Sequence, residues 1–212
     1  MSRHHKGKVI ICLHGGGWTK GTPYNRNFEG IESFVDKGYE VYAPTYPLVS
    51  DDPDKPYTPF PGVLWYIQKE INKFKDYKEV TLLGTSAGAT YAALTAIHYT
   101  NYTSQRTPDK LALLYGYYDF TDTSVLSPEV ARRFNLLMPS GDYIYRRRIS
   151  PTTNAEKLDS AGVDVRIFHG NNDDIIDPYA SFRLAGLLDK VTYVKYDGGH
   201  GTRVVDLYAP FI

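Results

Sequence analysis

The sequence has a single cysteine, no long apolar run and no excess of charge of either sign, and each absence excludes a class of protein. Because Cys12 has no partner in the chain, an intrachain disulfide is excluded, and a reducing compartment, the cytoplasm, is the simplest expectation for its location. The longest apolar runs have only the length of strands, which excludes a membrane-spanning helix. Since 24 basic residues balance 24 acidic ones, the composition predicts no binding to nucleic acid or to a charged membrane surface.

The residues that are present alternate between short β-type runs and segments with helical periodicity, over a chain of 212 residues that we expect to form one domain spanning 1–212. The β-type runs are apolar along nearly their whole length, as in strands that are covered on both faces. This alternation predicts the α/β class: a doubly wound, mainly parallel sheet of about six strands with helices on both faces. The strands are expected at 8–13, 39–44, 80–84, 111–115, 164–168 and 191–196.

Helices are expected between these strands, at 27–37, 61–77, 86–98, around 128–137 and from Pro178 onward. Asp177 precedes that proline and is a residue type that caps helix N-termini. Two segments interrupt the alternation. The segment 51–61 holds four prolines and predicts a rigid surface loop, and the long insertion 119–160 is a candidate lid.

The segment Gly84–Gly88 (GTSAG) ends one expected strand and opens the following helix. A serine hydroxyl is a poor nucleophile unless the fold exposes it beside a base. The glycines on both sides of Ser86 allow the sharp strand-to-helix turn of the G-x-S-x-G nucleophile elbow. Ser86 is therefore the candidate nucleophile, and a tight glycine turn with an incidental serine is the alternative.

A second glycine-rich segment, His14–Trp18 (HGGGW), follows the first expected strand and is a candidate oxyanion hole. Consecutive glycines let the backbone N–H groups of Gly16 and Gly17 converge with that of Ala87 on one substrate oxygen. One such donor is worth ~3 kcal/mol of barrier. A phosphate-binding loop is the alternative, but neither of the common glycine-rich phosphate-binding patterns is present.

His200 lies in a glycine-flanked segment after the last expected strand and is the candidate general base. The acid that orients this histidine is expected in the loop 171–177, where Asp173 and Asp174 compete. Asp177 is better explained as a helix cap, and Asp119 is an outside candidate.

Three aromatic residues near the expected sheet edge are candidates for a substrate pocket, although buried core rings are an equally good explanation: Trp18, Tyr117 and Tyr118. The run Arg146–Arg148 could hold an anionic substrate, but a solvated basic turn explains it better. The acidic loop lacks the spacing of a calcium site, so we expect no metal and no cofactor.

Together these segments resemble the α/β-hydrolase family and, within it, the esterase group related to hormone-sensitive lipase. HGGGW is similar to the oxyanion motif of that group, and GTSAG to its elbow GDSAGG. The stretch Asn171–Asp177 resembles the group's acid motif D-P-L-x-D, which implies Asp173 as the triad acid. The chain departs from the group at Thr85 and Ala89 and begins just before its first strand, so the resemblance implies a minimal fold without the N-terminal cap.

These observations predict a carboxylesterase-type serine hydrolase that acts on a small-molecule ester through an acyl-enzyme intermediate. Ser86 is the expected nucleophile, His200 the base and Asp173 the orienting acid. Three alternatives stay open: an amide hydrolase such as an arylformamidase or small peptidase, an acyltransferase or thioesterase with the same triad, and a non-catalytic binding protein on the same fold. The sequence does not state the natural substrate, the acyl chain length or the oligomeric state.

Overall fold

The computed structural model describes residues 6–23, 28–50, 52, 54, 58–99 and 106–212. Residues 51, 53 and 55–57 of the proline-rich loop predicted at 51–61 lie outside the described residues, as does the first residue of the helix predicted at 27–37.

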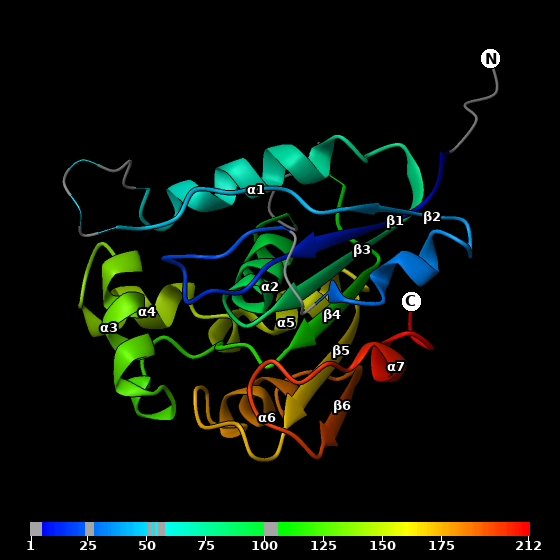
Figure 1. Cartoon of the computed structure of the whole chain (residues 1–212). Coiled ribbons are helices and arrows are strands. Elements are labelled where there is room, and N and C mark those ends of the chain that lie inside the picture. The colour runs from blue at the N-terminus through cyan, green and yellow to red at the C-terminus, as the bar shows by residue number, and fades with distance from the viewer. Residues whose placement is uncertain (1–5, 24–27, 51, 53, 55–57, 100–105) are drawn as a thin grey trace.

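A single parallel sheet forms the centre of the described chain (Figure 1). Its strand order is β2-β1-β3-β4-β5-β6, and every neighbouring pair runs in parallel. The strands are β1 (Lys6–Leu13), β2 (Tyr39–Tyr42), β3 (Tyr77–Thr85), β4 (Lys110–Leu114), β5 (Asp164–Gly170) and β6 (Val191–Tyr196). The predicted α/β class and the six predicted strands are therefore confirmed.

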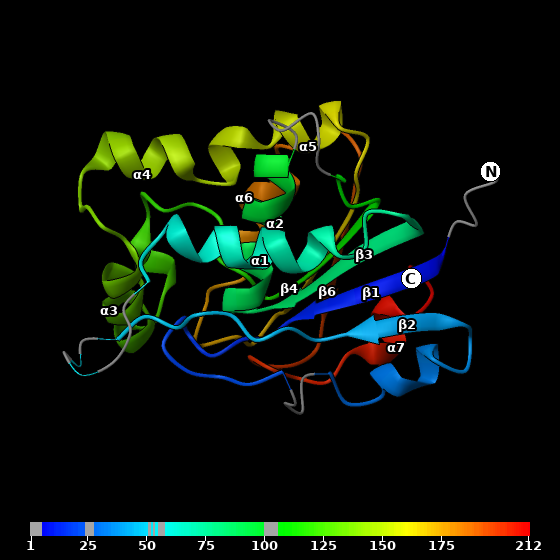
Figure 2. The same ribbon diagram turned by 90° about the horizontal axis from the view of Figure 1, so that it is seen from above.

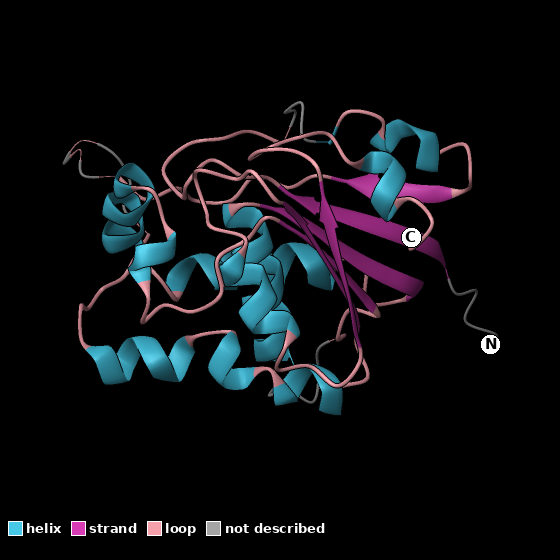
Figure 3. Ribbon diagram, turned by 90° about the horizontal axis from the view of Figure 1, so that it is seen from below, coloured by secondary structure: helices cyan, strands magenta, loops and turns pink. Residues whose placement is uncertain are grey.

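The sheet is covered on both faces, because alternate residues of each central strand enter different cores. In β1, Val9 and Ile11 pack into the larger core, whereas Ile10 and Cys12 pack into the smaller one. Figures 1 and 2 show α1 (Gly62–Asn72) and α2 (Ala87–Tyr99) over the larger core. The smaller core is covered by the 3-10 helix η2 (Ile31–Phe34) and by α7 (Val205–Tyr208), visible on the opposite face in Figure 3.

The helix predicted over 27–37 is wrong. The described residues 28–37 form 3-10 and turn conformations instead, including the helix η2, because Gly30 stands before η2 in a left-handed conformation (φ 91°) and no side chain caps that end. Gly38, with φ 83°, closes the segment. Val35 consequently leaves the expected apolar stripe and is 55% exposed.

The insertion 119–160 folds into helices that pack against the larger core. Its elements are η3 (Thr123–Val125), α3 (Pro128–Leu137), α4 (Tyr143–Ile149), η4 (Thr152–Asn154) and α5 (Glu156–Ser160). The helix α3 has the predicted bounds, with Pro128 in its first turn and Val130, Phe134 and Leu137 buried on one stripe. A lid role for this segment stays a prediction.

Phe134 is the centre of an aromatic cluster that attaches α3 to the rest of the protein. Its ring centroid lies 5.5 Å from that of Trp18, 5.0 Å from that of Tyr117 and 5.1 Å from that of Phe120. All four side chains are almost completely buried. The insertion is therefore tied to the loop after β1 and to the segment after β4 by aromatic packing.

We expect Phe134→Ala to lower the free energy of unfolding by about 3–5 kcal/mol, because the ring leaves a cavity that the surrounding rings fill only in part. Urea denaturation followed by tyrosine and tryptophan fluorescence measures this change. Tyr143→Ala is the matched control, since that ring is 59% exposed and its removal should change the free energy by less than about 0.5 kcal/mol. Equal effects of the two substitutions would contradict the assigned packing.

Candidate active site

The glycine-rich loop after β1 and the elbow after β3 meet at the switch point of the sheet. The chain passes from β1 to β2 on one side and then to β3 on the other, so the strand order reverses between β1 and β3. Open α/β sheets bind ligands in the crevice at such a point, beyond the carboxyl ends of the strands. Helix α6 (Tyr179–Ala185) follows β5 in the chain.

Ser86 stands on a sharp turn in a backbone conformation that few non-glycine residues adopt, with φ 53°. Its N–H donates to the carbonyl of Leu114 at 2.9 Å, which anchors the turn on β4. A Cβ on Gly84 would lie 2.4 Å from the carbonyl oxygen of Gly88, and a Cβ on Gly88 would lie 1.9 Å from that of Leu13. Both glycines are therefore required by close backbone approach, and Ser86 stands at the tip of the turn with 8% of its surface exposed.

The loop His14–Trp18 lies directly against this elbow. A Cβ on Gly15 would lie 3.0 Å from the carbonyl oxygen of Thr85 and 3.1 Å from Cβ of Ser86. Positive φ values of 131° at Gly16, 58° at Gly17 and 63° at Trp18 turn the backbone sharply at this point. Ala87 is the first residue of α2, and the first N–H groups of a helix have no partner within the helix.

The loop is held by His14, which is a structural residue in this arrangement. Its ring stacks on that of Tyr46 with centroids 4.3 Å apart, and its Nδ1 lies 2.8 Å from the carbonyl oxygen of Gly15. The Tyr46 hydroxyl donates to the carbonyl oxygen of His14. Burial lowers the pKa of His14, so the neutral ring is favoured in this position.

Ser86, His200 and Asp173 form a continuous hydrogen-bonded row. Nε2 of His200 lies 3.0 Å from Oγ of Ser86, and Nδ1 lies 2.7 Å from Oδ2 of Asp173. The Asp173 side chain is 0% exposed and that of His200 is 19% exposed. The base can therefore reach solvent and substrate while its acid partner cannot.

Four N–H groups surround the carboxylate of Asp173. Oδ1 accepts from the backbone N–H groups of Ile175 (2.9 Å) and Ile176 (3.0 Å). Oδ2 accepts from His200 and also from Nε2 of His169 at 3.1 Å. Burial raises the pKa of Asp173, but the hydrogen bonds from both histidines and the charge of His200 lower it by more, so the net shift is downward.

His169 is a further residue of the site. Sequence reasoning did not identify its contact with Asp173. Its Nδ1 lies 2.6 Å from Oγ of Ser181, and its Nε2 also lies 3.0 Å from the carbonyl oxygen of Ile176. These contacts place the ring between the carboxylate of Asp173 on one side and the hydroxyl of Ser181 on the other. The signal in the sequence was its place at the end of β5, four residues before Asp173.

Tyr115, which follows the last residue of β4, contacts the ring of His200. Its ring lies edge-on to that of His200, with centroids 4.8 Å apart, and it is 1% exposed. Its φ of 42° and the hydrogen bond from its N–H to the carbonyl of Phe168 direct the chain at the end of β4. The tyrosine therefore limits how far the imidazole can rotate away from the serine.

The loop that carries His200 is fastened to the loop that carries Asp173 by main-chain contacts. The N–H of Asn172 donates to the carbonyl of Gly198 at 3.0 Å, and that of Asn171 to the carbonyl of Tyr196 at 2.9 Å. A Cβ on Gly170 would lie 2.2 Å from the carbonyl oxygen of Gly198. The close approach of these two segments brings acid and base into register.

The structure places several candidate residues outside this row. Asp174 is exposed, and Asp177, one residue before the N-cap residue Pro178 of α6, accepts from the N–H of Tyr179 at 2.8 Å. Asp119 pairs with Arg183 at 2.6 Å. Of the acidic candidates, only Asp173 lies against His200 among the described residues.

The three aromatic pocket candidates are in the core rather than on an accessible wall. Trp18 is 1% exposed, and Tyr117 and Tyr118 are 0% exposed. Trp18 and Tyr117 pack against Phe134, and the hydroxyl of Tyr117 donates to the carbonyl of Asp122 at 3.1 Å. No ring face is left for a substrate in this arrangement, because the insertion covers them.

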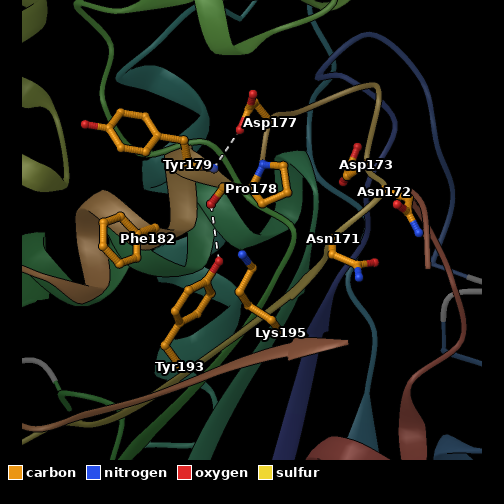
Figure 4. Close-up of a pocket in the computed structure, with 9 residues that line it drawn as sticks. All are labelled: Asn171, Asn172, Asp173, Asp177, Pro178, Tyr179, Phe182, Tyr193 and Lys195. Atoms are coloured by element: carbon orange, nitrogen blue, oxygen red, sulfur yellow. Dashed lines mark hydrogen bonds between the residues drawn. The ribbon is translucent and has the colours of Figure 1, made fainter. Parts of the chain in front are cut away.

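Two hollows border the acid and base loops. Figure 4 shows the first, on the outer side of the acid loop; it is lined by Asn171, Asn172, Asp173, Asp177, Pro178, Tyr179, Phe182, Tyr193 and Lys195. Neither Ser86 nor His200 lines it, and the carboxylate of Asp173 is not exposed to it. The second hollow is lined by Glu29, His200, Gly201, Thr202 and Arg203, and gives His200 its access to solvent.

A comparison with protein families assigns the fold that this geometry indicates. The BD-FAE family model matches residues 1–188. The chain belongs to the BD-FAE family. No curated protein matches this BD-FAE chain in sequence.

Solved structures similar to the BD-FAE chain share its α/β-hydrolase fold. Carboxyl esterase 2 from the mycorrhizal fungus Tuber melanosporum has a TM-score of 0.68 and 18% identity, over 93% of this chain and 69% of that one. The acetyl ester-xyloside bifunctional hydrolase from Caldicellulosiruptor lactoaceticus has a TM-score of 0.73 and 18% identity, over 99% and 80%. A carboxylesterase from Lactobacillus plantarum has a TM-score of 0.68 and 17% identity, over 92% and 73%.

The described part of the BD-FAE chain offers neither a membrane-spanning helix nor a cluster of metal ligands. No helix there is long and apolar enough to cross a membrane. Within the same residues, no group of three or more His, Cys, Asp or Glu side chains is placed to hold a metal ion.

The lowered pKa of Asp173 predicts a pH-dependent stability. Because the folded-state pKa lies below the unfolded value of about 3.9, the ionised carboxylate stabilises the fold above that value, and this contribution is lost as the pH falls toward the folded-state pKa. The difference in unfolding free energy between the wild type and Asp173→Asn should therefore shrink from about pH 6 to about pH 3. Urea denaturation across this range measures it.

Asp174→Asn is the matched control, since its side chain is exposed one residue away. The difference between the wild type and this control should stay small throughout. A difference for Asp173→Asn that does not change with pH would contradict the assigned hydrogen bonds.

Proposed function

We propose that this protein is a serine hydrolase that cleaves carboxylic esters of small to medium substrates. The observation that carries the proposal is the row Ser86–His200–Asp173, with the serine on a positive-φ elbow against a glycine loop. Esterase descriptions of the similar structures support it in the same direction. Each part of the row has a separate task in acyl transfer.

In the first half-reaction, Oγ of Ser86 attacks the ester carbonyl carbon while Nε2 of His200 takes the hydroxyl proton. The carbonyl π electrons move to its oxygen, and the N–H groups of Gly16, Gly17 and Ala87 bind the resulting oxyanion. When the intermediate collapses, the carbon–oxygen bond to the alcohol breaks and His200 gives its proton to that alcohol. The product is an acyl ester of Ser86.

In the second half-reaction, water replaces the alcohol. His200 takes one proton from the water as its oxygen attacks the acyl carbon, and returns the proton to Oγ of Ser86 when the acid leaves. Asp173 accepts the Nδ1 proton of His200 in a hydrogen bond throughout and stabilises the imidazolium that forms twice in each turnover.

We expect Ser86→Ala to lower the turnover of p-nitrophenyl acetate, butyrate and octanoate by about 10⁴-fold or more, because no nucleophile is left to form the acyl-enzyme. Initial rates of p-nitrophenolate release measure this loss, and the order of the three esters sizes the acyl site. Ser33→Ala is the control, since Ser33 is exposed on η2 and only bonds the carbonyl of Gly30.

The same substrate series separates the open alternatives. Turnover of formyl-amides or thioesters that depends on Ser86, with no ester turnover, would replace the ester proposal by an amide hydrolase or thioesterase with the same nucleophile. Equal rates for the wild type and Ser86→Ala on every substrate would overturn the catalytic role of the row.

The pH dependence of kcat/KM tests the base. We expect kcat/KM on p-nitrophenyl butyrate to fall as the pH is lowered from about 8 to about 5, because only the neutral imidazole of His200 can accept the serine proton. Initial rates at each pH measure this decrease. Near-ultraviolet circular dichroism at the same pH values shows whether the protein stays folded. A flat profile in this range would contradict the role of His200.

A further inference from the structure

Helix α3 brings a guanidinium group onto the glycine loop of the site. A Cβ built on Gly17 would lie 3.1 Å from Cδ and 3.1 Å from Nη1 of Arg133. Gly17 follows Gly16 in the loop that packs against Ser86. The arginine therefore lies against the loop segment whose N–H groups are proposed to bind the oxyanion. The absence of a side chain at position 17 is what admits the arginine.

One edge of this guanidinium is occupied and another is directed at the loop. Nε and Nη2 of Arg133 each lie 2.8 Å from Oε1 of Glu129, one turn earlier on α3. Nη1, on the opposite side, is the nitrogen that faces Gly17. Within the described residues Glu129 is the one acidic partner of Arg133, and it leaves Nη1 against Gly17 without an acidic partner there.

Arg133 shares its acidic partner with a second arginine, because Glu129 also pairs with Arg132 at 3.5 Å. The segment 128–149 carries five arginines against two acidic residues, whereas the whole chain has no net charge. Arg133 is the inward member of its pair, with 18% of its side chain exposed against 57% for Arg132.

The first predicted anion site, Arg146–Arg148, does not share this position. Arg146 donates to the side chain of Asn135 at 2.8 Å and lies 5.3 Å from the ring centroid of Phe134, so it braces α4 against α3. Arg147 and Arg148 are exposed. Only Arg133 places a positive charge beside the glycine loop within the described part of the insertion.

We propose that Arg133 is a specificity-determining residue, which selects ester substrates that carry a carboxylate group close to the scissile ester. The inference rests on the proposed esterase function and names its substrate class. A guanidinium fork matches the two oxygens of a carboxylate and is less strongly hydrated than an ammonium group, so a partly buried arginine suits such recognition. A carboxylate on the substrate would complete the pairing that Glu129 leaves open.

Two matched ester pairs test this selectivity on the two sides of the scissile bond. On the acyl side, mono-p-nitrophenyl adipate is compared with p-nitrophenyl hexanoate, since both have a six-carbon acyl chain and only the first ends in a carboxylate. On the alcohol side, p-acetoxybenzoate is compared with p-tolyl acetate. The quantity measured is the ratio of kcat/KM for the anionic ester to that for the neutral ester.

We expect the wild type to prefer the anionic member of at least one pair, and Arg133→Met to lower that ratio about 10-fold or more, as the loss of a charged hydrogen bond requires. Arg133→Lys should restore part of the ratio, because it keeps the charge and loses the fork. Arg132→Met removes the same charge from the same helix and the same carboxylate, and should leave the ratio within about threefold of the wild type. Thermal unfolding of each variant shows whether it is folded.

Different outcomes of this test overturn the selectivity of Arg133 and the esterase function on which it rests. If Arg133→Met and Arg133→Lys lower kcat/KM equally for both members of each pair, the arginine acts on the oxyanion in general and the selectivity is overturned. An unchanged ratio overturns it as well. If none of the four esters shows turnover that Ser86→Ala abolishes, the esterase function itself fails.

Discussion

The close approach of two backbones at the carboxyl ends of β1 and β3 is the constraint on which the site depends. The carbonyl oxygen of Leu13 occupies the space that a side chain on Gly88 would need, and Gly15 lies against Ser86 in the same way. This contact fixes the elbow in its left-handed conformation and sets the glycine loop beside it. Because both strands are hydrogen-bonded from Lys6–Tyr77 to Leu13–Gly84, the register of the sheet determines the distance between nucleophile and loop.

The other half of the site is built on β5 and β6, which β4 separates from β3. The loops after β5 and β6 are joined by main-chain hydrogen bonds, and they carry the acid and the base respectively. Tyr115, at the end of β4, links the two halves, because its ring contacts His200 and its own strand receives the amide of Ser86. Five adjacent strands, β1 and β3 to β6, therefore each supply one part of the proposed reaction centre.

The central strands β1, β3, β4 and β5 were predictable because most of their residues are buried and so read as continuous apolar runs, whereas the edge strands β2 and β6 contain only half-buried and exposed residues. The helix α3 was predictable because Pro128 marks its start and Val130, Phe134 and Leu137 repeat at helical spacing. The segment 27–37 has a similar apolar stripe, but backbone conformation at Gly30, which no periodicity reports, breaks it. Apolar periodicity therefore predicted helices and strands well where no residue with a positive φ interrupted the segment.

The site residues also divide into those that a local sequence pattern predicts and those that it does not. Ser86 and His200 lie in glycine-rich motifs with local signals, whereas the choice between Asp173 and Asp174 depends on the direction of one loop residue. The burial of Trp18 and Tyr117, and the contact of Arg133 with Gly17, depend on how the insertion packs on a loop more than one hundred residues earlier in the chain. Packing between distant segments has no signature in either segment alone.

The second histidine on Asp173 has a consequence for the energy of turnover. His169 and the amides of Ile175 and Ile176 orient the carboxylate whether or not His200 is charged, because none of them belongs to the loop that carries the base. When the imidazole gains its proton, the dipoles that stabilise the pair are already aligned, and little of the surroundings has to rotate. In the proposed reaction, folding has already oriented these groups, so each turnover begins from an environment polarised for the charged state.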